Sequence, residues 1–344
     1  MERVTKMSQT TPNITFDQVH TEKKQRQLTS MMEKTCAKVI ALGNPTTKAE
    51  TCPICHSDTI AHFTKRFGFD MSVCQQCAQI FCNPMPSKNQ LSFYYNSEMK
   101  DFENEFFLES FEHRIPIFER RIEIINKYMM SGRLLDVGSA VGIFVEALKR
   151  RSSKYEIHCC DPCESACAAL KSNYTNINTH QCMVEDLIKP TYFDGVSMWD
   201  TLEHISDPIS AARKINLLLK DKGFWFFSTP NTDSLEWSIA QKEHVQILPP
   251  GHINLFNETS IEHMLNQSGF SMVESYTLNG SLDVSYIQKL LSEDDRIIKK
   301  NAGALISRHI HDEEFARLLA QFLVATKKAG NIFVIAQKTG SPDA

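Results

Sequence analysis

The sequence of 344 residues contains no apolar run that approaches the roughly 20 residues needed to cross a bilayer. Its first stretch, Met1 to Lys24, is polar, mixed in charge and without the apolar core of a secretory signal. These two absences argue against a membrane partner and against export. We therefore expect a cytoplasmic protein.

The sequence also lacks an excess of basic residues. Lys and Arg number 37 against 41 Asp and Glu, which gives a formal net charge of −4. Nucleic-acid affinity rests largely on cationic contacts to phosphate, so a nucleic-acid partner is not expected. The 42% hydrophobic content excludes a wholly disordered or fibrous chain, and the length favours about two domains.

Cysteine, in contrast, is plentiful. The chain has 11 cysteines, an odd number that argues against a simple disulfide framework and favours metal binding. Two Cys-x-x-Cys pairs are separated by 18 residues, and they predict a closed tetrahedral shell for a structural Zn²⁺ ion, with no open position for chemistry. The predicted ligands are Cys52, Cys55, Cys74 and Cys77. The alternative is four unrelated thiols.

Strands and helices alternate from Leu134 onward, which predicts an α/β domain with a largely parallel sheet. The expected strands are Leu134–Val137, Ile157–Cys160, Val196–Trp199, Phe224–Ser228, Ser271–Leu278 and Asn331–Gln337. Asp207 and Pro208 should open one helix, and Thr259 with Glu262 should cap another. We divide the chain into a flexible leader (1–50), a zinc-binding module (51–87), a helical connector or lid (88–131) and an α/β domain (132–340) with a helical insertion at about 281–330.

A glycine turn follows the first of these strands. Asp136 ends the strand, Gly138 and Gly142 lie in the turn, and Asp161 ends the next strand, where an acid can accept hydrogen bonds from ribose hydroxyls. The dinucleotide fingerprint requires two further glycines, but Ala140 and Ile143 occupy those positions. The turn therefore argues for a nucleotide other than NAD; an ordinary strand–turn–helix corner is the alternative.

The spacing Asp136-x-Gly138-x-Ala140-x-Gly142 resembles the S-adenosylmethionine loop of class I methyltransferases, with Ala140 in place of a middle glycine. Two later segments resemble the same family: Phe193–Pro208 is similar to its fourth-strand signature, and Cys182–Leu187 falls at its adenine-contacting turn. The resemblance implies a Rossmann-like, seven-stranded sheet with helices on both faces. The cofactor-binding residues that it implies are Asp136, Gly138, Gly142, Asp161, Met183, Val184, Trp199 and Asp200.

The resemblance also assigns roles to these residues. Met183 or Val184 would pack on the adenine ring, and Asp161 would bind the ribose. Asp200 would lie near the methionine end of the cofactor, where it could hold the ammonium group.

The segment Cys74–Tyr95 and the later run from His252 to Phe256 resemble a zinc-bearing subgroup of small-molecule methyltransferases that includes deoxysugar C-methyltransferases. In this view the cysteine segment is a small zinc-ribbon-like module. Two departures weaken the sugar assignment: Pro249 and Pro250 stand where an aromatic is usual, and the large C-terminal domain of those enzymes does not fit in this length. The resemblance implies C- or O-methylation of a small-molecule acceptor.

His252 follows the fifth strand, at the sheet edge where ligands bind in such folds. We predict that it is the general base, the alternative being a histidine that merely orders its loop; a catalytic role for His204 is less favoured. The insertion could act as a lid or as a homodimer contact.

Two other functions stay open. The first is a zinc-containing ribosomal-RNA base methyltransferase, which should be more basic than this chain. The second is a degenerate methyltransferase fold that serves as an interaction module. Ala140 is the one hint of degeneration, and the retained Asp136, Gly138, Gly142 and Asp161 argue against it.

Overall fold

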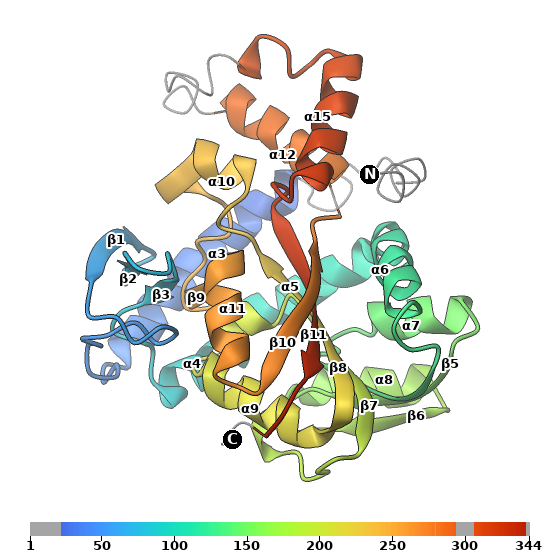
Figure 1. Cartoon of the computed structure of the whole chain (residues 1–344). Helices are drawn as coiled ribbons and strands as arrows, with labels where there is room; N and C mark the ends of the chain where they lie inside the picture. Colours follow the sequence, from blue (N-terminus) through green and yellow to red (C-terminus); the bar gives the residue numbers. More distant parts are fainter. Residues whose placement is uncertain (1–21, 279, 294–305, 342–344) are drawn as a thin grey trace.

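The computed structural model describes residues 22–278, 280–293 and 306–341. Its central feature is a seven-stranded sheet in the order β10-β11-β8-β7-β4-β5-β6 (Figure 1). The strands are β4 (Ser131–Val137), β5 (Lys154–Cys160), β6 (Ile177–His180), β7 (Phe193–Trp199), β8 (Leu219–Pro230), β10 (Phe270–Tyr276) and β11 (Asn331–Lys338).

Five neighbouring strands, from β8 to β6, run parallel, and β11 runs antiparallel to both β8 and β10. The predicted α/β class and largely parallel sheet are therefore confirmed. Parallel strands bring their carboxyl ends to one edge, so the loops after β4, β5, β7 and β8 meet there. The short strand β6 was not predicted, because its sequence Ile-Asn-Thr-His has no apolar run and is only partly buried.

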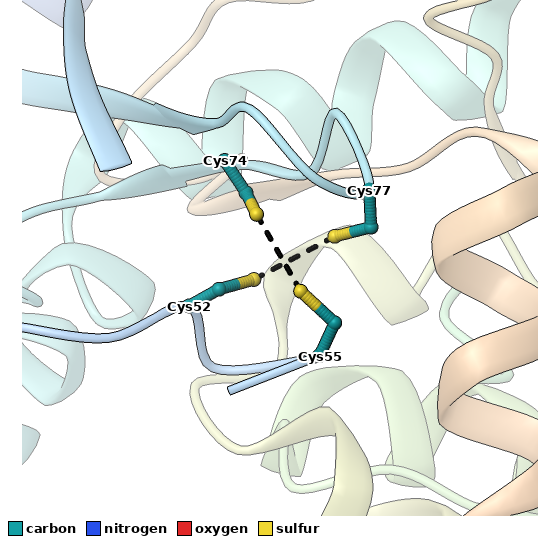
Figure 2. A group of neighbouring side chains, drawn as sticks. All are labelled: Cys52, Cys55, Cys74 and Cys77. Atoms are coloured by element: carbon teal, nitrogen blue, oxygen red, sulfur yellow. Dashed lines mark hydrogen bonds between the residues drawn. The ribbon is translucent and has the colours of Figure 1, made fainter. Parts of the chain in front are cut away.

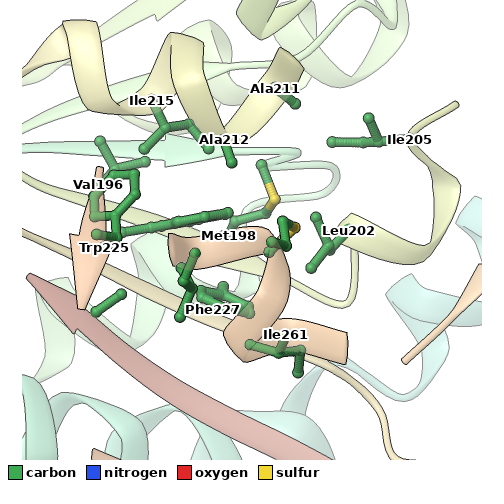
Figure 3. Close-up of a cluster of buried hydrophobic side chains, with 14 of the residues drawn as sticks. Val196, Met198, Leu202, Ile205, Ala211, Ala212, Ile215, Trp225, Phe227 and Ile261 are labelled. Atoms are coloured by element: carbon green, nitrogen blue, oxygen red, sulfur yellow. The ribbon is translucent and has the colours of Figure 1, made fainter. Parts of the chain in front are cut away.

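Helices cover both faces of the sheet. Along β8, Trp225 and Phe227 point to one face and Phe226 to the other, as the period of two requires. The first face packs against α9 (Pro208–Leu218) and α11 (Glu258–Asn266), as Figure 3 shows for Ala212, Ile215 and Ile261 on those helices. The second packs against α6 (Phe111–Ile125) and α7 (Ile143–Arg150), and α8 (Glu164–Asn173) adds Leu170 to that core.

The start of α9 is as predicted, with the Asp207 carboxylate accepting from the backbone of Ser210 and Pro208 in the first turn. The predicted cap of α11 is wrong. Asn257, rather than Thr259, is the N-cap residue, and its partner in the capping box is Ser260. Asparagine is as good an N-cap as threonine or better, and here its side chain is buried, which fixes the entry of the helix.

The cysteine segment folds into a second sheet of order β1-β2-β3-β9, made by β1 (Ile60–Arg66), β2 (Phe69–Cys74), β3 (Ile80–Cys82) and β9 (Asn254–Leu255). Around it lie α3 (Glu22–Ala41), α4 (Lys88–Tyr95) and α5 (Glu98–Glu109). The predicted flexible leader is thus partly a helix: Met32, Cys36 and Val39 on α3 are buried against this sheet. Residues 1–21 lie outside the described part of the chain.

The predicted insertion is helical. Its described helices, α12 (Gly280–Glu293) and α15 (Glu313–Ala325), pack on one another and on α10 (Leu235–Ala240), and form their own apolar cluster beyond one end of the sheet (Figure 1). Short 3₁₀ turns complete the domain at η2 (Val184–Asp186), η3 (Leu202–His204) and η4 (Gln241–Glu243). Among the described helices, none is both long enough and apolar enough to pass through a bilayer.

Candidate active site

The turn between β4 and α7 has the backbone that its glycines predict. Gly138 and Gly142 adopt φ values of +72° and +83°. A Cβ atom at Gly138 would lie 2.4 Å from Thr201 Oγ1, and one at Gly142 would lie 2.7 Å from Leu170 Cδ2. Ala140 has a φ of +44° and so takes a left-handed conformation too, at a cost of about 1–2 kcal/mol for a residue with a Cβ.

Asp161 bridges the end of β5 to this turn. One carboxylate oxygen accepts from the backbone N–H of Ala140 at 2.9 Å, and the other accepts from that of Cys163 at 2.8 Å. Burial raises the pKa of Asp161, and the two N–H donors oppose that rise. Each oxygen keeps a lone pair, so the carboxylate can still accept from a ligand hydroxyl.

Asp136 lies below the turn. It is 2% exposed, accepts from Ser197 Oγ at 2.7 Å, and has its pKa raised to about 7 by burial. This carboxyl group supports the turn from inside the protein and does not present itself to solvent. Asp136 therefore supports the turn from the core, whereas Asp161 can still accept from a ligand.

Two further predicted cofactor residues, Met183 and Val184, begin the loop after β6. Met183 is 48% exposed, whereas Val184 is 4% exposed and belongs to the core. Only Met183 thus offers an apolar surface that a flat ring could cover.

Trp199 and Asp200 end β7. Trp199 is buried among Phe118, Phe144 and Phe333, with ring centroids 5.2 to 6.2 Å away. Asp200 accepts from Ser228 Oγ at 3.0 Å and from Asn331 Nδ2 at 2.6 Å.

Arg121 on α6 was not predicted and lies beside this acid. Its guanidinium group is 3.5 Å from the Asp200 carboxylate and is stacked over the rings of Phe118 and Trp199. A buried arginine in the middle of a helix has no signature in a single sequence. Asp200 is consequently held by three side chains, and its carboxylate is still 45% exposed.

The loop after β7 carries a group of titratable side chains close to the glycine turn, since Thr201 abuts Gly138 and η3 begins at the next residue. His204 Nδ1 is 2.9 Å from the carbonyl oxygen of Gly251 and 3.2 Å from the Tyr95 hydroxyl. The ring of His252 lies 4.9 Å from that of His204, centroid to centroid.

The hydrogen bonds of the two histidines fix their tautomers. His252 Nδ1 is 2.9 Å from the carbonyl oxygen of Gln246, as His204 Nδ1 is from that of Gly251. A carbonyl oxygen only accepts, so each Nδ1 carries the proton and each Nε2 keeps a lone pair. Burial lowers the pKa of both rings. Both are therefore neutral near pH 7, with a basic nitrogen available.

Glu203 is the third member of this group. It is 1% exposed, accepts from Thr229 Oγ1 at 3.0 Å, and has its pKa raised to about 8 by burial. One donor atom from each of Glu203, His204 and His252 lies within 4.8 Å of the others, which is a spacing that a divalent cation could also use.

The four predicted zinc ligands converge on one point, as Figure 2 shows. The Sγ atoms of Cys52 and Cys77 are 3.7 Å apart and those of Cys55 and Cys74 are 3.5 Å apart. A tetrahedral shell with Zn–S bonds of 2.3 Å has S–S edges of about 3.8 Å. The cysteine shell therefore fits a zinc ion in size, ligand type and number.

The predicted cofactor and base residues thus lie around one edge of the seven-stranded sheet, apart from the four cysteines, and the fold adds Tyr95 and Arg121 to them. Tyr95 ends a run of three aromatic residues, Phe93 to Tyr95, and nothing in that run indicates a contact with His204. Three features meet at the carboxyl edge of this seven-stranded sheet: a left-handed glycine turn, an acid that bonds to the turn from the next strand, and adjacent basic groups. Together they define a class I S-adenosylmethionine-dependent methyltransferase.

Comparison with known proteins identifies the family. A family model described as a methyltransferase domain matches residues 97–275, just over half of the chain, and the chain belongs to that family. Similar curated proteins include the ubiquinone biosynthesis O-methyltransferases of Acinetobacter baumannii (strain AYE), at 28% identity, and Neisseria meningitidis serogroup C (strain 053442), at 27%. Each match covers 45% of this chain and 75% of the relative.

Solved structures with a similar fold include coclaurine N-methyltransferase bound to N-methylheliamine and S-adenosylhomocysteine. It is 13% identical, has a TM-score of 0.43, and the match covers 67% of this chain and 73% of that one. A second is the Haemonchus contortus phospholethanolamine N-methyltransferase 2, at 16% identity and a TM-score of 0.41, with 63% of this chain and 52% of that one covered.

Proposed function

We propose that the protein methylates a small-molecule acceptor, with His252 as the general base. The observation that carries this proposal is the pair of neutral histidines whose Nδ1 protons are held by backbone carbonyls. The bound cofactor supplies a methyl group that is already activated on a sulfonium sulfur. The protein then has to position the acceptor, exclude water and take up one proton.

The choice of His252 over His204 rests on their partners. The Nδ1 side of His204 faces both the Gly251 carbonyl and the Tyr95 hydroxyl, and burial holds the pKa of His204 well below its ordinary value. The pKa of His252 is lowered by burial. The hydrogen bond to Gln246 and the charges of Glu103 and Asp200 oppose that effect, while Lys100 adds to it. His252 is the ring better able to keep a proton after transfer, while His204 and Tyr95 orient the acceptor.

On the cofactor side, we assign the ribose hydroxyls to Asp161 and the amino-acid tail to the Gly138–Gly142 backbone and Asp200. Met183, half exposed beside the end of β5, would cover the adenine ring. Asp136, Val184 and Trp199 would support this pocket from the core. Both glycines are needed for this backbone, because a Cβ at either one would collide with Thr201 or Leu170.

The acceptor class follows from charge and from the relatives. A net charge of −4 gives little attraction for a polyanionic strand, which disfavours the ribosomal-RNA alternative. The curated relatives are named O-methyltransferases of ubiquinone biosynthesis, which favours an oxygen nucleophile over carbon. We keep the division into leader, zinc module, connector and catalytic domain, with the insertion as a lid or homodimer contact.

We also propose one structural zinc ion bound by Cys52, Cys55, Cys74 and Cys77. Elemental analysis of purified protein should give close to one equivalent of zinc, and Cys74→Ser should lower it strongly. A metal-free protein of equal stability would refute this assignment.

The substrate class is tested with methyl-labelled S-adenosylmethionine. Purified protein is added to a small-molecule extract and, separately, to bulk RNA and protein fractions. We expect labelled product in the small-molecule fraction alone. Label confined to RNA or protein would overturn the substrate class, and binding of the cofactor without transfer in any fraction would favour an interaction module.

A further inference from the structure

The loop that carries His252 leads directly into the cysteine sheet. Strand β9, which begins two residues after His252, is the fourth strand of the cysteine sheet, with Ile80 opposite Leu255 and Phe81 opposite Asn254. The backbone N–H of Cys82 also donates to the carbonyl of Ile253 at 2.8 Å. The cysteine segment therefore supplies backbone partners for the residues next to the proposed base.

The same residues are held from the catalytic side. The N–H of Ile253 donates to the carbonyl of Glu203 at 2.9 Å. Asn254 is fully buried; its Nδ2 donates to the carbonyl of Ile205 at 2.7 Å, and its Oδ1 accepts from Gln79 Nε2 at 3.3 Å. The backbone after His252 is thus clamped between the cysteine sheet and the loop of η3.

The two Cys-x-x-Cys turns also hold the helix that follows. Asn257, the N-cap of α11, donates from Nδ2 to the carbonyl of Cys77 at 2.9 Å. Gln267, at the other end of α11, donates from Nε2 to the carbonyl of Ile54 at 2.6 Å. Each cysteine turn therefore bonds to one end of α11, and the separation of the turns sets the position of this helix.

We infer that the four-cysteine module is a positioning device for the catalytic loop: the metal-bound cysteine turns, through β9 and α11, place His252 against the acceptor. This inference rests on the proposed role of His252 as the base. A reacting group displaced by about 1 Å can lose about 100-fold in rate, so a loosened clamp should reach the chemistry. The cofactor turn has different anchors, since Gly138 N–H donates to the Cys160 carbonyl and Ala140 N–H to Asp161.

The first test compares the full-length protein before and after zinc is removed with a chelator, by amide hydrogen exchange. We expect faster exchange in residues 246–256 and little change in residues 138–142. S-adenosylmethionine affinity should stay within about threefold while turnover falls by about tenfold or more, and added zinc should restore turnover. Unchanged exchange in 246–256 overturns the inference, and so does loss of cofactor affinity together with turnover, which would mean general unfolding.

The second test keeps the metal in place. Gln79→Met removes the donor to Asn254, and Gln79 Oε1 has no hydrogen-bond partner among the described residues to lose. We expect unchanged zinc content and cofactor affinity, severalfold slower turnover, and an acidic limb of the turnover–pH profile shifted upward, because a looser loop lets water reach His252. Gln76→Met, at an exposed glutamine between Cys74 and Cys77, is the matched control.

Wild-type turnover and pH profile in Gln79→Met would overturn the positioning role. The failure of the proposed base is distinguishable: if His252→Ala kept full turnover, the assignment of the base would fall, while the exchange rates of residues 246–256 would still report whether the module holds the loop.

Discussion

The cofactor side and the acceptor side of the site are built in different ways. The glycine turn and Asp161 come from one continuous stretch, β4 to β5, and Asp161 accepts from Ala140 within it. The acceptor side combines Tyr95, Glu203, His204 and His252 from three distant segments, joined through a second sheet. The glycine turn and Asp161 thus form a local motif, whereas Asp200 and the groups that we propose for the acceptor are brought together by the whole fold.

The comparison is tested most strongly at His252. His252→Ala should lower turnover by about 100-fold or more, the usual contribution of a general base, because the proposed acceptor of the proton is then missing. S-adenosylmethionine affinity, measured by isothermal titration, should be almost unchanged. His113→Ala, an exposed histidine on α6, is the control. Turnover close to wild type in His252→Ala would remove this residue from the mechanism.

The opposite effect is expected at Asp161. Loss of hydrogen bonds to a buried hydroxyl pair costs about 1–3 kcal/mol, so Asp161→Ala should weaken S-adenosylmethionine binding by about tenfold to a hundredfold. Asp161→Asn keeps one acceptor oxygen and should lose less. Tighter binding of NADH than of S-adenosylmethionine by the wild-type protein, or an unaltered dissociation constant in Asp161→Ala, would contradict the assignment of this acid.

The third prediction is the pH dependence of turnover, which tests the acceptor side alone. A histidine base acts when neutral, above its pKa, and burial lowers the pKa of His252 below its ordinary value of 6.5. The single-turnover rate should therefore fall by less between pH 7 and pH 6 than the loss of about threefold expected for a histidine of ordinary pKa. An acidic limb centred at or above 6.5 would show that the ring is open to water.

The same division explains what could be predicted from the sequence. The strands, the glycine turn, Asp161 and the cysteine shell follow from patterns within about 25 residues, and the structure brings each set together. His252 could be placed only at a sheet edge. The position of His252 beside His204 depends on hydrogen bonds to the carbonyls of Gly251 and Gln246. The strand that follows His252, β9, is two residues long and has no periodicity to detect. Arg121 is invisible for a similar reason, since its partner Asp200 is far away in the chain.

The smallest effect is expected at Ala140, and it distinguishes an imperfect cofactor motif from one that no longer binds the cofactor. Ala140 stands where similar loops have glycine, and its φ of +44° costs about 1–2 kcal/mol that a glycine would not incur. Its backbone N–H still donates to Asp161, so the loop keeps its bond to this acid in spite of the strain. Ala140→Gly should therefore raise the free energy of unfolding by at most about 1 kcal/mol, because the unfolded chain also gains freedom. Cofactor affinity should stay equal or become slightly tighter. Denaturant melts with and without S-adenosylmethionine measure both quantities. If Ala140→Gly instead created cofactor binding that the wild-type protein lacked, Ala140 would mark a site that had lost its cofactor.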